Sequence, residues 1–173
     1  MKIELKKIKV SESQSEETTA FTADIYVDGK NAGYAKNDGH GGCTFISSYE
    51  SKGRELLESA EAYCATLPSK VIKGLKGLFK VDLESLVDDL LYEHLNAKEA
   101  ARIAKRLPKD MIKGVCYKTD GGYVVQNFKG YTLIQLMTIP NGVAAVIKLI
   151  KRLKSEGKEI LNTNLTPEIL AAI

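Results

Sequence analysis

The sequence predicts an α+β fold, and three observations carry this prediction. Apolar and polar residues alternate over residues 2–10 and 21–27, which is typical of a half-buried antiparallel sheet. Helical spacing of apolar residues follows in several stretches, and Asp120-Gly121-Gly122 then indicates a second β-hairpin. We expect the order β-β-β-α followed by helix-helix-β-hairpin-helix. We also expect a β-rich unit over 1–68 and a helical and hairpin unit over 69–173, packed as one compact body.

The N-terminal strands follow from the alternation and from turn residues. Residues 2–10 alternate until Lys6-Lys7, where the phase slips, so an edge strand with a bulge is predicted there. Residues 21–27 predict a half-buried strand. Asp28-Gly29 predicts a hairpin to a partner strand at 32–36, because both turn positions need positive φ. A further strand is predicted at 43–47.

The first helix is predicted from a capping pattern. Ser47 and Glu50 lie at capping-box spacing, which favours a helix start near Ser47 or Ser48, and Pro68 predicts the helix end. Residues 69–80 are ambiguous, because two glycines interrupt a helical spacing.

Two further helices are predicted in close succession. Asp82 is a suitable N-cap for a helix over 83–95. Asn96 with Glu99 repeats the capping pattern at once, so a separate helix is predicted over 97–107, ending before Pro108.

The last third of the sequence predicts a hairpin and a long helix. Strands are expected at 111–118 and 123–128, and residues 131–137 favour a strand or a short helix. Pro140-Asn141-Gly142 predicts a chain break before a helix over 143–155. A helix start at Thr166-Pro167-Glu168 predicts that the tail docks as one short helical turn.

Composition limits the kinds of protein that this chain can be. A chain of 173 residues with 44% hydrophobic and 27% charged residues is typical of a soluble globular protein. The net charge of +3 implies no global attraction to nucleic acid or to a membrane. Three widely spaced cysteines favour free thiols in a reducing compartment. There is no apolar stretch long enough for a signal peptide or a membrane span. We therefore expect a cytoplasmic protein without a membrane partner.

The order of elements after residue 82 suggests one hypothesis for function. A helix, a tight turn, a second helix and a hairpin is the order of a winged helix-turn-helix, whose second helix enters the major groove of DNA. Residues 97–129 carry eight basic and three acidic side chains, which suits contact with the phosphates of DNA or RNA. The alternative is that these lysines and arginines only form the solvated face of an alanine-rich helix. The residues predicted to contact nucleic acid are Lys98, Arg102, Lys105, Arg106, Lys109 and Lys118.

A glycine-rich stretch suggests a second hypothesis. It lies between two predicted strands and matches neither nucleotide-binding fingerprint. The simplest interpretation is a strand connection with glycines at positive φ. The functional interpretation is a loop that contacts a protein or ligand, as in an interaction or inhibitor module of the phage or mobile-element type. The predicted loop residues are Tyr34, Asn37, Asp38, Gly39, His40, Gly41, Gly42 and Tyr49.

Enzyme and metal chemistry form a third alternative. His40 and Cys43 lie three apart, but the other candidate ligands, Cys64, His94 and Cys116, are scattered singly. A nucleophilic pair of Cys43 or Cys116 with a histidine has no supporting local motif. We therefore predict a non-catalytic binding or regulatory protein with no cofactor and no metal. Nucleic acid and protein remain alternative partners, and the sequence leaves the oligomeric state open.

Overall fold

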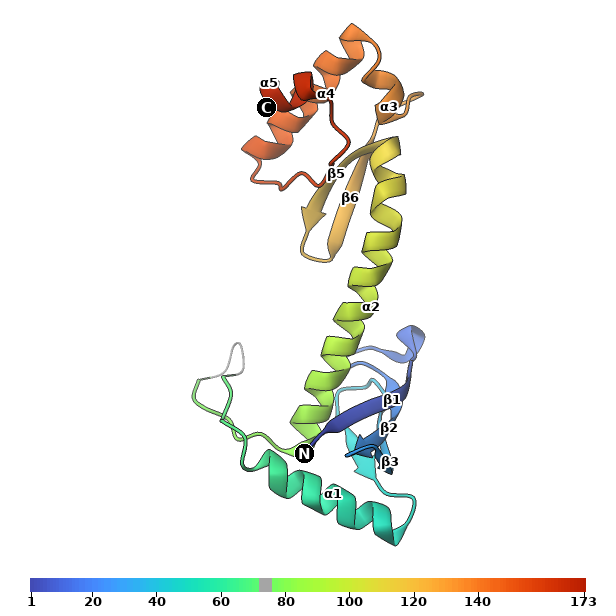
Figure 1. Ribbon diagram of the computed structural model, residues 1–173, viewed down its shortest axis with the longest axis vertical. Coiled ribbons are helices and arrows are strands. Elements are labelled where there is room, and N and C mark those ends of the chain that lie inside the picture. Colours follow the sequence, from blue (N-terminus) through green and yellow to red (C-terminus); the bar gives the residue numbers. More distant parts are fainter. Residues whose placement is uncertain (72–75) are drawn as a thin grey trace. The chain divides into compact units, whose positions relative to one another are not determined.

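A computed structural model describes residues 1–71 and 76–173. The predicted α+β class is confirmed by a four-stranded antiparallel sheet, several helices and a later β-hairpin (Figure 1). Contacts group the chain into two units, Met1–Asn96 and Ala97–Ile173. The predicted division after residue 68 stays a prediction. Part of the ambiguous segment 69–80, residues 72–75, lies outside the described residues.

The N-terminal sheet has the strand order β1-β2-β3-β4, with every pair antiparallel. The strands are β1 (Ile3–Val10), β2 (Phe21–Val27), β3 (Lys30–Asn37) and β4 (Phe45–Ser47). The bulge predicted in the first strand is confirmed, since the register shifts between Lys6 and Lys9 and Lys7 has a φ of 51°. The predicted turn is confirmed as well, with φ of 47° at Asp28 and 81° at Gly29.

One face of this sheet forms the core of the first unit. Alternate residues of β2, such as Ile25 at 0% exposure, point inward. They pack with Ala60 and Cys64 of α1 (Ser51–Cys64) and with Val87 from the start of α2 (Leu83–Lys113). Because side chains alternate along a strand, the residues between the buried ones point to the opposite face.

The bounds predicted for the first helix are wrong at both ends. Helix α1 begins at Ser51, and its N-cap residue Glu50 makes no side-chain cap bond. The predicted capping box cannot form because Ser47 is extended and pairs with Tyr34 of β3. The helix ends at Cys64, and a turn that includes a bond from the Leu67 amide to the Cys64 carbonyl precedes Pro68.

The prediction of two helices between residues 83 and 107 is also wrong, since α2 is continuous over 31 residues. Only Asp82 acts as a cap: its Oδ1 accepts from the Ser85 amide at 2.8 Å, and its own amide donates to Ser85 Oγ at 3.2 Å. Asn96 lies inside the helix. Pro108 removes one intrahelical bond, yet the helix continues to Lys113, whose ammonium pairs with Asp110.

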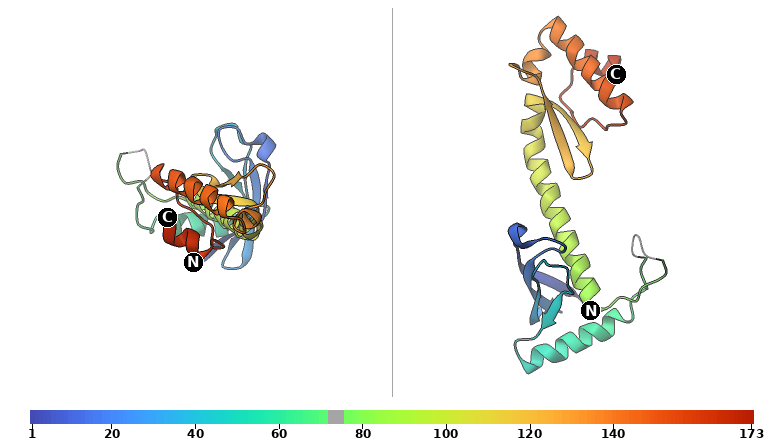
Figure 2. Two further views of the ribbon diagram at one scale, coloured as in Figure 1. Left: turned by 90° about the horizontal axis from the view of Figure 1, so that it is seen from above. Right: turned by 180° about the vertical axis from the view of Figure 1, so that it is seen from behind.

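Besides residues 97–113 of α2, the second unit contains a hairpin and the helices α3 to α5 (Figure 2). Strands β5 (Gly114–Thr119) and β6 (Gly122–Asn127) form the predicted hairpin, but β5 begins late because α2 occupies residues 111–113. Residues 131–137, predicted as a strand or a short helix, contain the short helix α3 (Leu133–Leu136). Helix α4 (Pro140–Ser155) starts earlier than predicted, since proline is tolerated in a first helical turn. Helix α5 (Pro167–Ala172) begins at the predicted start, and Thr166 is its N-cap.

The core of the second unit joins these elements, with Val115, Leu133, Val146, Ile150 and Ile169 each at 0% exposure. A short 3-10 helix, η1 (Glu12–Gln14), completes the secondary structure described. Among the described residues, no helix has the length and apolarity that crossing a membrane requires.

Candidate functional site: the outer face of the N-terminal sheet

The sheet face opposite the core carries aromatic and lysine side chains, and we call it the outer face. Strand alternation and cross-strand register decide its members. Asp24 lies opposite Tyr34, and Lys36 lies opposite Phe45. The face holds four lysines against two carboxylates. Its members are Glu4, Lys6, Lys7, Lys9, Thr22, Asp24, Tyr26, Tyr34, Lys36, Phe45 and Tyr49.

Three aromatic rings are in contact on the outer face. The centroid of Tyr34 lies 5.2 Å from that of Tyr49 and 6.2 Å from that of Phe45. Phe45 is 51% exposed and Tyr49 is 61% exposed. Lys36 Nζ lies 5.2 Å from the Phe45 ring centroid, within cation–π range. The cluster therefore offers exposed ring surface next to a positive charge.

Asp24 organises the centre of the face. Its Oδ2 pairs with Lys7 Nζ at 2.9 Å, and its Oδ1 accepts from the Tyr49 hydroxyl at 3.1 Å. The bond from Lys7 lowers the pKa of Asp24, so the carboxylate stays ionised at neutral pH. The ion pair partly neutralises Asp24, and the hydrogen bond from the Tyr49 hydroxyl to Asp24 holds Tyr49 beside Tyr34. Bulges re-aim side chains at sheet edges, and here the bulged residue is Lys7 itself.

A shallow hollow of about 480 Å³ lies on the outer face. Tyr34 and Tyr49 form its aromatic part, and lysines from β1 and β3 border it. Flat rings stack on planar ligand groups, and ammonium groups neutralise anionic ones. The other lining residues include Lys7, Lys9, Thr22, Asp24, Asn31 and Lys36.

The structure brings together two residues of the predicted partner loop, Tyr34 and Tyr49. The glycine-rich connection between them is held by local hydrogen bonds. The Gly39 carbonyl accepts from the amides of Glu16, Glu17 and Thr18 at 3.0–3.2 Å. Asn37 Oδ1 accepts from the Gly39 amide and from the Thr18 hydroxyl. These bonds attach the connection to the loop that precedes β2.

The backbone conformation of this connection explains its glycine content. Gly39 and Gly41 have φ of 90° and 83°, as a strand connection of this kind predicts. Asn37 Nδ2 donates to the Gly42 carbonyl, and the Asp38 carboxylate accepts from the His40 amide at 3.3 Å. Contact of this loop with a partner stays a prediction.

Carboxylates and burial shape the surroundings of the histidine and cysteines considered above as ligands or nucleophiles. His40 Nδ1 faces Glu16 at 3.3 Å. The Glu84 carboxylate raises the pKa of the Cys43 thiol, and burial raises that of Cys116 to about 11. A nucleophilic thiol needs the opposite shift. Within 1–71 and 76–173, no three His, Cys, Asp or Glu side chains form a group suited to a metal ion.

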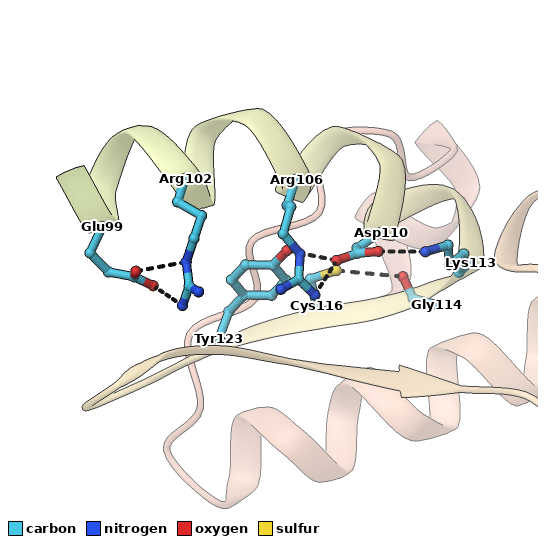
Figure 3. Close-up of polar contacts among 8 residues, drawn as sticks. All are labelled: Glu99, Arg102, Arg106, Asp110, Lys113, Gly114, Cys116 and Tyr123. Atoms are coloured by element: carbon cyan, nitrogen blue, oxygen red, sulfur yellow. Dashed lines mark hydrogen bonds and ion pairs between the residues drawn. The ribbon is translucent and has the colours of Figure 1, made fainter. Parts of the chain in front are cut away.

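The basic residues predicted to contact nucleic acid lie on α2 and on the hairpin. Arg102 pairs with Glu99 at 2.8 Å, Arg106 approaches Asp110 at 3.5 Å, and Lys118 approaches Glu159 at 3.3 Å. In Figure 3 both arginines extend from α2 toward the strand that carries Tyr123. Exposed positions are held by Lys98, Lys105 and Lys109. A continuous α2 removes the tight turn on which the winged-helix prediction depends.

Sequence reasoning did not identify most of the outer face. Lys6, Lys7, Lys36 and Phe45 were not selected, because each becomes relevant only beside its cross-strand neighbour. The alternation along β2 could have identified this face, because Thr22, Asp24 and Tyr26 alternate with buried residues. The hairpin turn then sets which residues of β3 lie opposite them. Comparison with protein-family models, with curated proteins and with solved structures gave no match to this chain.

Proposed function

We propose that the outer face of the N-terminal sheet binds single-stranded nucleic acid. Bases stack on the exposed rings of Phe45 and Tyr49 and on the half-buried ring of Tyr34 between them, and the surrounding lysines contact phosphates. The observation that carries this proposal is the contact cluster of three rings on an open sheet face bordered by four lysines. Stacking platforms beside basic side chains are a general solution for binding single strands.

The lysines favour nucleic acid over a protein partner for this face. Lysine is depleted at the centres of protein–protein interfaces, where desolvating its ammonium group is costly. Here Lys36 lies against the Phe45 ring, and Lys6 Nζ lies 4.1 Å from the Tyr26 centroid, so charge and aromatic surface are interleaved. The outer face is a different surface from residues 97–129, for which nucleic-acid contact stays a prediction.

The test measures binding of a fluorescently labelled single-stranded oligonucleotide by anisotropy. Tyr34→Ala and Tyr49→Ala are expected to weaken binding roughly 5- to 150-fold, because each lost base stack is worth about 1–3 kcal/mol. The matched control is Tyr92→Ala. Tyr92 is 68% exposed on α2 and lies outside the outer face, so its removal is expected to leave binding unchanged.

A second measurement follows the salt dependence of the same binding. Lys36→Glu is expected to reduce the slope of log affinity against log salt by about one, as for a lost phosphate contact. Lys52→Glu, at an exposed position of α1, is the control. No binding by the wild-type protein, or equal binding by Tyr34→Ala, would overturn the proposal. So would a protein partner that needs Tyr34 while the oligonucleotide does not bind.

A further inference from the structure

In the second unit, the described residues extend the pairing of the β5–β6 hairpin on the β5 side and not on the β6 side. On the β5 side, the Lys118 amide donates to the Glu159 carbonyl at 2.9 Å and the Leu161 amide donates to the Cys116 carbonyl at 2.8 Å. On the β6 side, no strand or isolated bridge within the described residues continues the sheet past β6. Strand β6 is therefore an open edge.

The bonds on the β5 side identify which backbone groups of β6 face the open edge. In an antiparallel pair, successive residues direct their amide and carbonyl toward and away from the partner strand in turn. Cys116 and Lys118 direct theirs away from β6, and their cross-strand partners are Val125 and Tyr123. The amides and carbonyls of Tyr123 and Val125 therefore face away from β5, and they have no hydrogen-bond partner among the described residues.

A hollow of about 250 Å³ lies between β6 and α2. Tyr123 and Val125 of β6 line one side, and α2 lines the other through Ile103 and two arginines. Figure 3 shows Arg102 and Arg106 extending from α2 toward β6. Gly121 leaves the turn end open, since a Cβ there would meet nothing within 4 Å. The complete lining is Glu99, Arg102, Ile103, Arg106, Gly121, Gly122, Tyr123 and Val125.

A buried carboxylate holds the two sides of the hollow together. Asp110 is 5% exposed, and its Oδ2 accepts from the Tyr123 hydroxyl at 2.7 Å. The same carboxylate pairs with Lys113 at 2.7 Å and approaches Arg106 Nη2 at 3.5 Å. Of the charged side chains that line the hollow, two are arginines, Arg102 and Arg106, and one is a carboxylate, Glu99 (Figure 3). The hollow is preformed and carries an excess of positive charge.

The composition of β6 lacks the features that prevent strand pairing. Its residues Gly-Tyr-Val-Val-Gln-Asn include no charge and no proline. The edge strand of the other sheet, β1, carries Lys6, Lys7 and Lys9 together with a bulge. Charges and bulges are the usual means by which edge strands avoid pairing. The edge of β6 is therefore suited to accept another strand.

We propose that an extended acidic peptide segment of a partner protein adds to the edge of β6. Its backbone bonds with Tyr123 and Val125, and its carboxylates contact Arg102 and Arg106. This is recognition by strand addition, in which backbone bonds provide affinity and neighbouring side chains provide specificity. A second copy of β6 fits less well, because it would bring no acidic side chain to the two arginines. The proposal is independent of nucleic-acid binding by the outer face.

The experiment uses the full-length protein and an end-blocked synthetic peptide of alternating Glu and Val, with a Lys-Val peptide as its counterpart. Amide hydrogen exchange at Tyr123 and Val125 is expected to be fast in the free protein and slowed by the Glu-Val peptide. Val124 is the internal control, since its backbone faces Tyr117 of β5 in both states. The Lys-Val peptide is expected not to slow exchange at these positions.

Two sets of variants separate the backbone and charge contributions. Val125→Pro removes the edge amide and is expected to abolish binding, whereas Val125→Ala loses similar packing but keeps the amide and retains binding. Arg102→Gln with Arg106→Gln is expected to weaken Glu-Val binding about tenfold or more. The matched control is Arg152→Gln, which alters an exposed arginine of α4 paired with Glu156.

Four outcomes would overturn the proposal. They are equal affinity of the Val125→Pro and Val125→Ala variants, binding of the Lys-Val peptide as tight as that of the Glu-Val peptide, and the absence of any Glu-Val binding. The fourth is a protein that dimerises with Tyr123 and Val125 already protected, since the edge would then belong to a second copy.

Discussion

Replacing Asn96 by alanine tests the continuity of α2, because the two interpretations of this residue predict effects of opposite sign. If Asn96 were the N-cap of a second helix, Asn96→Ala would cost about 1 kcal/mol of stability. In the structure Asn96 lies inside a helix that runs from Leu83 to Lys113. Its side chain is exposed and makes no hydrogen bond within the described residues. The substitution then changes helix propensity alone.

The expected magnitude follows from that environment. Alanine is the best helix former, and asparagine is less favourable by about 0.6 kcal/mol in a helix interior. We therefore expect Asn96→Ala to stabilise the protein by about 0.5 kcal/mol. Asp82→Ala provides the contrast, since Asp82 accepts the Ser85 amide at 2.8 Å as a true N-cap. That substitution is expected to destabilise by about 1 kcal/mol.

The assay is urea unfolding followed by the helical circular dichroism signal, with both variants and the wild type measured in parallel. A continuous helix would be supported if the urea midpoints of the two variants shift in opposite directions while the dependence of the unfolding free energy on urea concentration stays unchanged. A destabilised Asn96→Ala variant, shifted in the same direction as Asp82→Ala, would contradict a continuous helix and indicate a helix boundary at residue 96.

Two further predictions concern the connection before β4 and the buried carboxylate. Gly39→Ala is expected to cost about 1–3 kcal/mol by urea unfolding, because its φ is 90° and its Cβ would lie 2.1 Å from the Gln14 carbonyl oxygen. Gly42→Ala, with nothing within 4 Å, should be neutral, and equal costs would contradict the prediction. Tyr123→Phe removes a bond to Asp110 and should cost about 1–3 kcal/mol at neutral pH. Lys113 and Tyr123 lower the pKa of Asp110 in the folded protein. The ionised Asp110 therefore stabilises the fold above the pKa that it has in the unfolded chain, and this contribution is lost as pH falls through its pKa in the folded protein. The variant should therefore lose less stability than the wild type in acid, and parallel pH profiles would contradict this.

Local signals in the sequence account for most of the strands and turns. The alternation in Phe21–Val27, the bulge at Lys6-Lys7 and the Asp28-Gly29 turn depend on residues that are neighbours along the chain. Asp82 and Thr166 likewise cap their helices through residues three positions away. Such features can be predicted because their energetics involve few distant contacts.

Helix boundaries were predicted less well, because the same residues suit a cap and a helix interior. Asn96 and Ser47 both carry capping signals, but neither acts as a cap. Ser47 pairs with Tyr34 in the sheet, and α2 continues past Asn96 between residues packed in each unit, such as Leu91 and Met111. A cap is worth about 1 kcal/mol, so tertiary packing readily overrides it.

The α+β class, the hairpin turns and the stretches that become strands can be predicted from the sequence, since periodicity and turn chemistry are properties of neighbouring residues. Which side chains meet depends instead on how distant segments pack. Tyr34, Phe45 and Tyr49 form a cluster through strand register, and the backbone of β6 stays open because residues 159–161 cover the other edge of its hairpin. Both surfaces depend on pairing between segments far apart in the chain, which no local pattern specifies.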